Sequence, residues 1–297
     1  MLDLSIIIVN WNTKAFLRDC LKSVYASEGE FTFETIVVDN CSHDGSGSMV
    51  RQEFPYVHLI ESDVNGGYAY ANNLGLRHLQ ADCHLLLNAD TVVPPHALED
   101  MLAFMQAHPE AGMAGPKLVM ADGELDLACR RSFPTPENSF YKLFGLSRLF
   151  PNSKRFAQYN LSYLDPDEMA EVDSVVGAFM MVRREVIEQI GFLDERYFMY
   201  AEDLDWALRA KQAGWKVYYY PQVTVLHHKR RSSEQNPQKA HYEFWRAMHL
   251  FYRKHYAKDT RFWLHCLVLG GLVLRGGTGM LREIFRSEKG VATEAQR

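Results

Sequence analysis

Acidic side chains stand at two places where the sequence could support chemistry. Asp90 closes the apolar run LLLNAD, and Glu202 and Asp203 open the helical pattern EDLDWALRA. A carboxylate at the end of a strand can hold a divalent cation, and that cation can in turn bind a diphosphate. A carboxylate at the start of a helix beside such a site can take a proton from an attacking hydroxyl group. Each also has a structural explanation, because Asp90 can cap the following turn and the helix dipole stabilises acids in its first turn.

A histidine and two arginines add to these candidates. His227 ends the run VTVLH and is a candidate second metal ligand, although a structural histidine fits the same position. Arg130 and Arg131 precede an aromatic stretch and could grip an acceptor diphosphate, with solvation at the surface as the alternative. Asp205 and Arg209 have the i,i+4 spacing of a surface ion pair, which we interpret as structural.

The first half of the chain must position these residues, and in it apolar runs alternate with helical patterns. Residues 4–9, 35–40 and 84–90 read as buried strands. Alternation of this kind predicts an α/β fold with a mainly parallel sheet flanked by helices. Ligands bind such sheets at the carboxyl ends of the strands, so we expect a binding crevice there. The polar residues at these ends are Asn10, Asp39, Asn65 and Asn88 to Asp90.

The second half of the chain is less regular. Residues 121–172 are rich in proline and aromatic side chains. A strand and a helix that stops at Gly191 follow, and residues 216–221 and 223–228 read as two edge-type strands. From Gln238 a long helix continues. We therefore predict two parts, an α/β domain at 1–235 and a C-terminal helical extension at 236–297.

Composition narrows the class of protein. The chain has 297 residues and a formal net charge of −5, so it is no obvious nucleic-acid binder. Its five cysteines form no CxxC pair, which argues against a disulfide framework and for a reducing compartment. It contains no GxGxxG or GxxxxGK[ST] motif, which argues against a nicotinamide-dependent oxidoreductase or a P-loop enzyme. The N-terminal apolar run is too short for a signal peptide, so we expect the cytoplasm.

Seven segments together resemble the family 2 glycosyltransferases of the GT-A fold, and within them the rhamnosyltransferase-like members. They occur in the family's order across residues 4–232, and their joint pattern is far more specific than any one of them. Processive polysaccharide synthases carry a QxxRW segment that is missing here, so we expect single sugar additions. The segments are SIIIVNWN, ETIVVDNCSHDGS, NGGYAYANNLG, LLLNADTVV, VVGAFMMVRR, GFLDERYFMYAEDLDWALRAKQAGW and VLHH.

The resemblance implies which residues contact a nucleotide-sugar donor. Some would surround the base and ribose, others would shape the nucleotide pocket, and the last two would line the floor where donor sugar and acceptor meet. These residues are Val9, Trp11, Asp39, Asn65, Gly67, Asn72, Asn88, Ala89, Asp90, Gly177 and Ala178.

The resemblance also implies the catalytic groups. Asn88-Ala89-Asp90 matches the family's metal-binding DxD position with its first acid replaced by Asn. Asp90 is then the one carboxylate ligand of a Mg²⁺ or Mn²⁺ ion, and His227, donor phosphates and water complete the shell. Asp203 would be the catalytic base, with Glu202 beside it. The implied reaction is a single displacement with inversion at the anomeric carbon.

The expected substrates follow from the same resemblance. The donor implied is dTDP-rhamnose, and the acceptor is a glycan or a polyprenyl-diphosphate-linked saccharide in bacterial cell-surface polysaccharide synthesis. A non-catalytic carbohydrate-binding protein with the same fold is the alternative from another class.

The C-terminal run FWLHCLVLGGLVL (262–274) is the remaining feature. It is shorter than the roughly 20 residues that cross a bilayer. Arg261 and Arg275 flank it and Trp263 lies near its start, which fits an interfacial anchor on an anionic membrane. We therefore expect peripheral contact with the inner face of the cell membrane. Internal packing of this helix, or a homodimer contact, remains the alternative.

Overall fold

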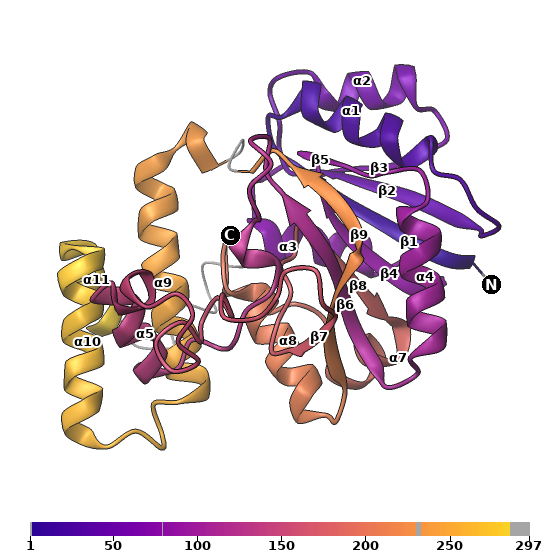
Figure 1. The fold of residues 1–297 in the computed structure, drawn as a ribbon. Helices are drawn as coiled ribbons and strands as arrows, with labels where there is room; N and C mark the ends of the chain where they lie inside the picture. The colour runs from indigo at the N-terminus through magenta and orange to yellow at the C-terminus, as the bar shows by residue number, and fades with distance from the viewer. Residues whose placement is uncertain (1, 79, 230–232, 286–297) are drawn as a thin grey trace.

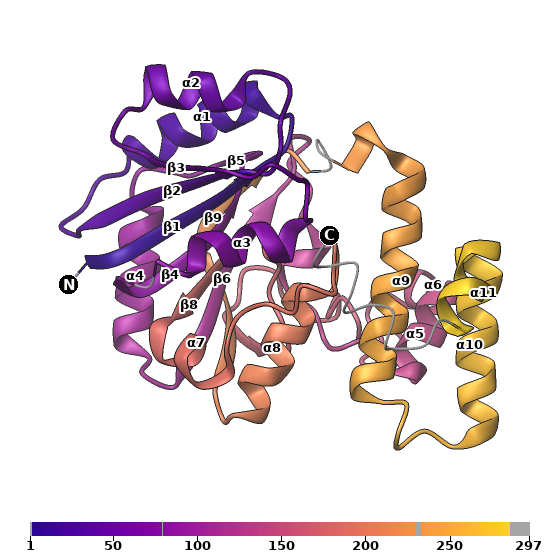
Figure 2. The ribbon, with the colours of Figure 1, turned by 180° about the vertical axis from the view of Figure 1, so that it is seen from behind.

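A nine-stranded sheet forms the centre of the molecule, and helices cover both of its faces (Figures 1 and 2). The computed structural model describes residues 2–78, 80–229 and 233–285. The strand order is β3-β2-β1-β4-β8-β6-β9-β5, with β7 paired to β9. The strands are β1 (Leu2–Asn10), β2 (Phe33–Asp39), β3 (His58–Glu61), β4 (Ala81–Asn88), β5 (Thr91–Val92), β6 (Ala111–Val119), β7 (Ala170–Val172), β8 (Phe179–Arg183) and β9 (Lys216–His227).

The predicted parallel sheet is confirmed. The longest ladders, β1 with β2, β1 with β4 and β6 with β9, are parallel, while β8 enters antiparallel between β4 and β6. Leu4, Ile6, Ile7 and Ile8 of β1 have no exposed surface, because helices lie over both faces of this strand. A parallel sheet covered on both sides needs such continuous apolar runs.

The helices of the α/β layer follow the predicted amphipathic patterns. The helix α1 buries Leu17, Cys20, Leu21 and Val24, which are one face of the 3.6-residue repeat. The helix α7 ends at Gly191, whose φ of +76° is readily adopted by glycine. The helices of this layer are α1 (Lys14–Tyr25), α2 (Ser46–Glu53), α3 (Tyr68–Leu76), α4 (Ala97–Ala107), α7 (Arg184–Ile190) and α8 (Glu202–Gln212).

The prediction of two edge strands at 216–221 and 223–228 was wrong. The structure has one strand, β9, which lies inside the sheet between β6 and β5. Pro221 cannot donate a ladder hydrogen bond, and the pairing with β6 moves there from Tyr220 to Thr224. The register of the pairing with β6 shifts at the proline, and the strand continues to His227.

A second group of helices stands beside the α/β layer (Figure 1). It contains α9 (Pro237–His255), α10 (Phe262–Gly276) and α11 (Thr278–Phe285), which contact one another. The short helices α5 (Pro136–Leu143) and α6 (Leu146–Leu149) of the irregular segment lie with them. Arg275 of α10 donates to the carbonyl of Leu143 at 3.1 Å. The helical group therefore draws on two separate parts of the chain, and the division at residue 235 stays a prediction.

Asp205 does not form the surface pair expected from its spacing. Its carboxylate is fully buried and accepts from Arg209 Nε at 3.0 Å. It also accepts from Lys254 and His255 of α9, each at 2.7 Å. Because removing one partner of a buried ion pair is costly, these contacts anchor α9 to α8.

No helix in the described ranges combines the length and the apolar character needed to cross a membrane.

Candidate active site

The carboxyl ends of β1, β2 and β4 meet at one edge of the sheet. The register aligns Asn10 with Asp39 and Val9 with Asn88. Asn10 Nδ2 donates to Asp39 Oδ1 at 3.0 Å, and both side chains are buried. Trp11 follows β1 at the same edge and is partly exposed. The structure therefore brings together the polar strand ends from which we expected a crevice.

The loop that carries Asn65 and Gly67 is fixed by side-chain amides. Asn65 Oδ1 accepts from Asn40 Nδ2 at 2.9 Å and from the Gly67 amide at 3.2 Å. Gly67 has a φ of +91°, and a Cβ built there would lie 2.3 Å from the carbonyl oxygen of Phe198. Only glycine allows this close approach between the loop and the segment that leads to α8.

Asn72 and Tyr68 connect this loop to the floor of the site. Asn72 Nδ2 donates to the carbonyl of Tyr68 at 2.9 Å, while its buried Oδ1 has no partner among the described residues. Buried acceptors are nearly always satisfied, so this oxygen is available to a bound molecule or to water. The Tyr68 hydroxyl donates to the carbonyl of Gly177 at 2.7 Å. The next residue, Ala178, accepts from the Asn88 amide at 3.0 Å.

Asp90 and His227 meet where β5 pairs with β9. His227 Nε2 lies 3.4 Å from Asp90 Oδ1, and the amide of His228 donates to the Asp90 carbonyl at 2.9 Å. Two ligands held at about 2.1 Å by one ion lie about 3 Å apart, so this pair fits a shared divalent cation. The side-chain nitrogen of Asn88, Nδ2, lies 3.5 Å from His227 Nε2. No cluster of three or more His, Cys, Asp or Glu ligands occurs in the described parts of the chain, so an ion here would draw on these two.

Asp126 is a site residue that sequence reasoning missed. Its fully buried carboxylate lies 3.1 Å from His227 Nδ1 and also pairs with Lys229. A carboxylate on one ring nitrogen orients a metal-binding histidine and directs its other nitrogen outward. Asp126 belongs to no strand and to no regular apolar pattern, so only the fold reveals this contact.

The two carboxylates shift the protonation of His227. Burial lowers the pKa of this imidazole, but the hydrogen bonds to Asp126 and Asp90 outweigh burial and raise it to about 9. In the metal-free protein at neutral pH the ring is therefore a cation between two carboxylates.

Asp203 stands at the start of α8 with a fixed carboxylate. Its Oδ2 accepts from Arg131 at 2.7 Å and from the Gly177 amide at 3.1 Å, and its Oδ1 accepts from the Leu204 amide at 2.7 Å. Each carboxylate oxygen can accept two hydrogen bonds. Oδ1 therefore keeps a lone pair that can accept a proton.

Glu202, next to Asp203, has a carboxyl group that is protonated at neutral pH. Its side chain is buried, and Oε2 has no hydrogen-bond partner in the described structure. Burial, and then repulsion from Asp203, raise the pKa of Glu202 to about 8. At neutral pH Glu202 is mainly protonated, while Asp203 is held by a guanidinium. A protonated carboxyl group beside a carboxylate held by an arginine can divide acid and base roles.

The backbone before α8 is strained. Tyr200 and Ala201 have φ values of 72° and 62°, in the left-handed region that costs a non-glycine residue about 1 to 2 kcal/mol. Strained backbone persists only where the surrounding structure imposes it, and it is frequent at functional sites. Here the two residues turn the chain so that Glu202 and Asp203 begin the helix.

The two arginines expected to hold the acceptor lie inside the protein. Arg130 is buried and donates to the carbonyls of Leu164 and Asp165 at 2.8 and 2.6 Å. Arg131 is buried against Asp203 and the carbonyl of Val175. Both guanidinium groups are buried and bind groups of the protein, so surface solvation does not describe these positions. The Nε of each has no partner among the described residues, and the acceptor role stays a prediction. The structure gives Arg131 a different place, as the partner of Asp203.

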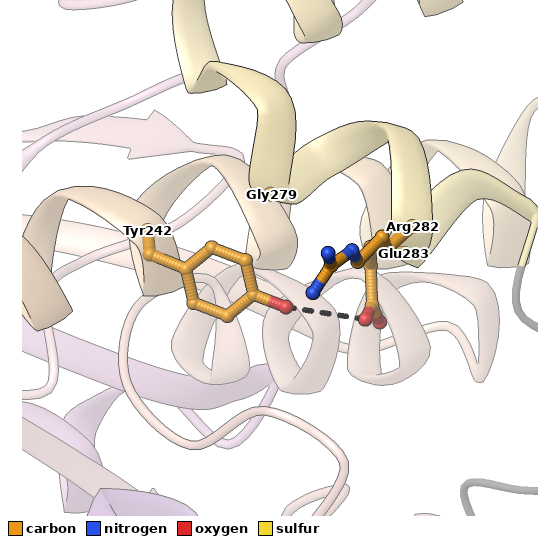
Figure 3. Close-up of a pocket in the computed structure, with 4 residues that line it drawn as sticks. All are labelled: Tyr242, Gly279, Arg282 and Glu283. Carbon is orange, nitrogen blue, oxygen red and sulfur yellow. Dashed lines mark hydrogen bonds between the residues drawn. The ribbon is translucent and has the colours of Figure 1, made fainter.

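A separate hollow lies away from the strand ends. It has a volume of about 500 Å³ and lies between α9 and α11, lined by Tyr242, Gly279, Arg282 and Glu283 (Figure 3). The Tyr242 hydroxyl donates to Glu283 Oε2 at 3.2 Å, as the dashed line in Figure 3 marks. Glu283 of α11 also forms an ion pair with Arg246 of α9, and this pair connects the two helices. The chemistry at the strand ends is not in this hollow.

Comparison with known proteins assigns the class and then the family. The chain is similar in fold to a mannosyltransferase from Pyrobaculum calidifontis in complex with GDP-Man and Mn²⁺, with a TM-score of 0.58 and 17% identity over 100% of this chain and 81% of that one. The α/β architecture is thus that of a GT-A glycosyltransferase. Residues 5–191 match the model of Glycosyl transferase family 2. The protein belongs to that family and is a nucleotide-sugar glycosyltransferase, as the motifs predicted.

Two curated relatives narrow the comparison. The chain is 27% identical to the N-acetylglucosaminyl-diphospho-decaprenol L-rhamnosyltransferase of Mycobacterium tuberculosis, over 96% of this chain and 95% of the relative. It is 25% identical to the rhamnosyltransferase WbbL of Escherichia coli K12, over 75% of this chain and 82% of the relative. Membership of the rhamnosyltransferase-like subgroup is therefore supported over nearly the full described length.

Proposed function

We propose that this protein is an inverting transferase that moves one L-rhamnose from dTDP-rhamnose to a polyprenyl-diphosphate-linked acceptor in bacterial cell-surface polysaccharide synthesis. The observation that carries the proposal is the carboxylate of Asp203, with one unfilled lone pair on Oδ1 beside Gly177. The donor and acceptor rest on the similarity to the two rhamnosyltransferases.

The proposed reaction is a single displacement. Asp203 Oδ1 takes the proton of the acceptor hydroxyl as the hydroxyl oxygen attacks the anomeric carbon. The bond from that carbon to the diphosphate breaks, and its electron pair leaves with the diphosphate. Arg131 and the Gly177 amide hold Oδ2, so the base does not rotate away from the attacking oxygen. The sugar is delivered with inverted configuration.

The donor-binding residues follow from the strand ends. Asp39, Asn65 and Asn72 would bind the nucleotide, with Val9 and Trp11 beside the base. Asp90 and His227 would hold a Mg²⁺ or Mn²⁺ ion, which supplies positive charge to the leaving diphosphate. Asn88 and Ala89 lie between these groups, and Gly177 and Ala178 form the floor below the sugar.

A donor panel tests this assignment. The purified protein is incubated with Mn²⁺, a short-chain prenyl-diphosphate N-acetylglucosamine, and either dTDP-rhamnose, UDP-N-acetylglucosamine or GDP-mannose. We expect kcat/KM with dTDP-rhamnose to exceed that with the others by at least about 100-fold, because unmatched polar groups in the pocket penalise the wrong donor. Preference for another donor would overturn the rhamnosyl assignment but not the transferase class.

The helix α10 supports peripheral contact with a membrane. Leu272 is its one buried residue, whereas Trp263, Leu267 and Leu274 are 59%, 65% and 82% exposed. Spacings of four and seven residues place these three on one helical face. With Arg261 and Arg275 at its ends, this face fits an anionic lipid surface on the inner side of the cell membrane.

Cosedimentation with phosphatidylglycerol vesicles tests this contact. Because a large apolar side chain contributes about 1.5 to 3 kcal/mol when buried, Leu267→Asp should lower vesicle binding by about tenfold or more. Tyr56→Asp, at an exposed position on the α/β domain, is the matched control and should bind like the wild type. If the wild-type protein does not cosediment with the vesicles and elutes as a homodimer in size-exclusion chromatography, the exposed face of α10 is a protein contact instead.

A further inference from the structure

Lys142 of α5 is a cation without an acidic partner. Its Nζ lies 3.9 Å from the ring centroid of Tyr159. The residue retains exposed surface, while its ammonium group is largely surrounded by protein atoms, and within the described residues it forms no ion pair with a carboxylate. An ammonium group placed on an aromatic ring retains donors for a further ligand.

Lys142 lies close to the proposed catalytic base. The carbonyl of Tyr159 accepts from the Ser132 amide at 2.9 Å, directly after Arg131, which binds Asp203. Burial, and then the charges of Arg131 and Lys229, lower the pKa of Lys142 to about 8. The positive charge of Lys142 is therefore repelled by its surroundings and would be stabilised by an anion.

The same helix and the residue that follows it present an aromatic surface. Phe140 and Phe144 are 51% and 62% exposed, and their ring centroids are 4.4 Å apart. Their exposure leaves them free to contact an apolar chain, and α5 lies beside α10 through the contact of Arg275 with Leu143. Phe140 and Phe144 are four residues apart and share one face, whereas Lys142, two residues from each, lies on the other face. A molecule with an anionic head and an apolar tail can reach both faces by passing around the C-terminal end of α5.

We infer that Lys142 binds the diphosphate of the prenyl-linked acceptor, while Phe140 and Phe144 contact the first part of its prenyl chain. This inference rests on the proposed function, because it places the acceptor hydroxyl beside Asp203. It assigns to Lys142 the diphosphate contact expected from Arg130 and Arg131, whose guanidinium groups bind groups of the protein. The donor also carries a diphosphate, so the test must separate the two substrates.

The test measures binding of farnesyl diphosphate by calorimetry to protein already saturated with dTDP and Mn²⁺. We expect Lys142→Gln to weaken this binding by about tenfold or more, through loss of a charge-assisted hydrogen bond. Lys142→Arg should retain binding, because it retains the charge. Lys154→Gln, at an exposed lysine of the same irregular segment, is the matched control and should bind like the wild type.

Two results would overturn the inference. One is unchanged farnesyl diphosphate binding by Lys142→Gln. The other is a loss of dTDP binding in that variant with farnesyl diphosphate binding intact, which would assign Lys142 to the donor. Release of dTDP from dTDP-rhamnose by the wild type, measured separately, tests the proposed function and not this subsite.

Discussion

Replacing Asp203 by Asn is expected to lower kcat by about 1,000-fold, because the amide oxygen cannot take the proton of the acceptor hydroxyl. The amide oxygen can take the place of Oδ2 and still accept from Arg131 and the Gly177 amide, so most of the local geometry should be retained. The contact of Oδ1 with the Leu204 amide is lost, because the NH2 group of Asn cannot accept a hydrogen bond. The measurement is transfer at saturating donor and acceptor. Binding of dTDP should change little, since we propose that Asp203 contacts the acceptor hydroxyl and not the nucleotide.

The matched control is Glu202→Gln. Glu202 is mainly protonated at neutral pH, because burial and Asp203 raise its pKa to about 8. Its replacement by the neutral, similarly shaped Gln should therefore lower kcat by less than about tenfold. Equal losses in the two variants, or full activity of Asp203→Asn, would remove Asp203 as the base. Thermal unfolding of both variants excludes a general loss of fold, because the Asn variant leaves the buried Arg131 without a charged partner.

Replacing Asp90 by Ala is expected to remove the contribution of Mn²⁺ to dTDP binding. Calorimetry with Mn²⁺ and with EDTA should show wild-type affinity raised by about 100-fold with the metal, and no such difference in the variant. Asp82→Ala is the matched control, because Asp82 lies near the opposite end of β4 and is exposed. Metal-enhanced binding that persists in Asp90→Ala would exclude Asp90 as the principal ligand.

Proton release gives a second measure of the same site. His227 has a raised pKa of about 9 without metal, so its ring is protonated at pH 7.5, and a metal bound at Nε2 must displace that proton. We expect release of about one proton for each Mn²⁺ bound, and Mn²⁺ affinity that rises as the pH increases toward 9. Calorimetry at pH 7.5 in buffers of different ionisation enthalpy measures this number. A value near zero would place the ion away from His227.

Local sequence patterns determined much of the fold and the general place of the site. Apolar runs such as residues 4–9 and 84–90 predicted the buried strands, because a strand covered on both faces must be apolar along its length. The polar residues at the ends of these runs predicted the functional edge, because parallel strands carry their carboxyl ends to one side. The acids of EDLDWALRA were found by type and spacing, and the family resemblance then suggested their roles.

Tertiary structure alone decided which side chains meet. Asp126 and His227 are 101 residues apart, and Arg131 and Asp203 are 72 apart. No local repeat predicts such contacts, because they depend on strand order and on the path of the irregular segment. The same holds for β9, in which pairing inside the sheet carries the strand past Pro221. The periodicity of a helix or strand shows only which of its own residues are buried. The partner of a buried charge comes from a distant part of the chain, so it is known only once the chain is folded.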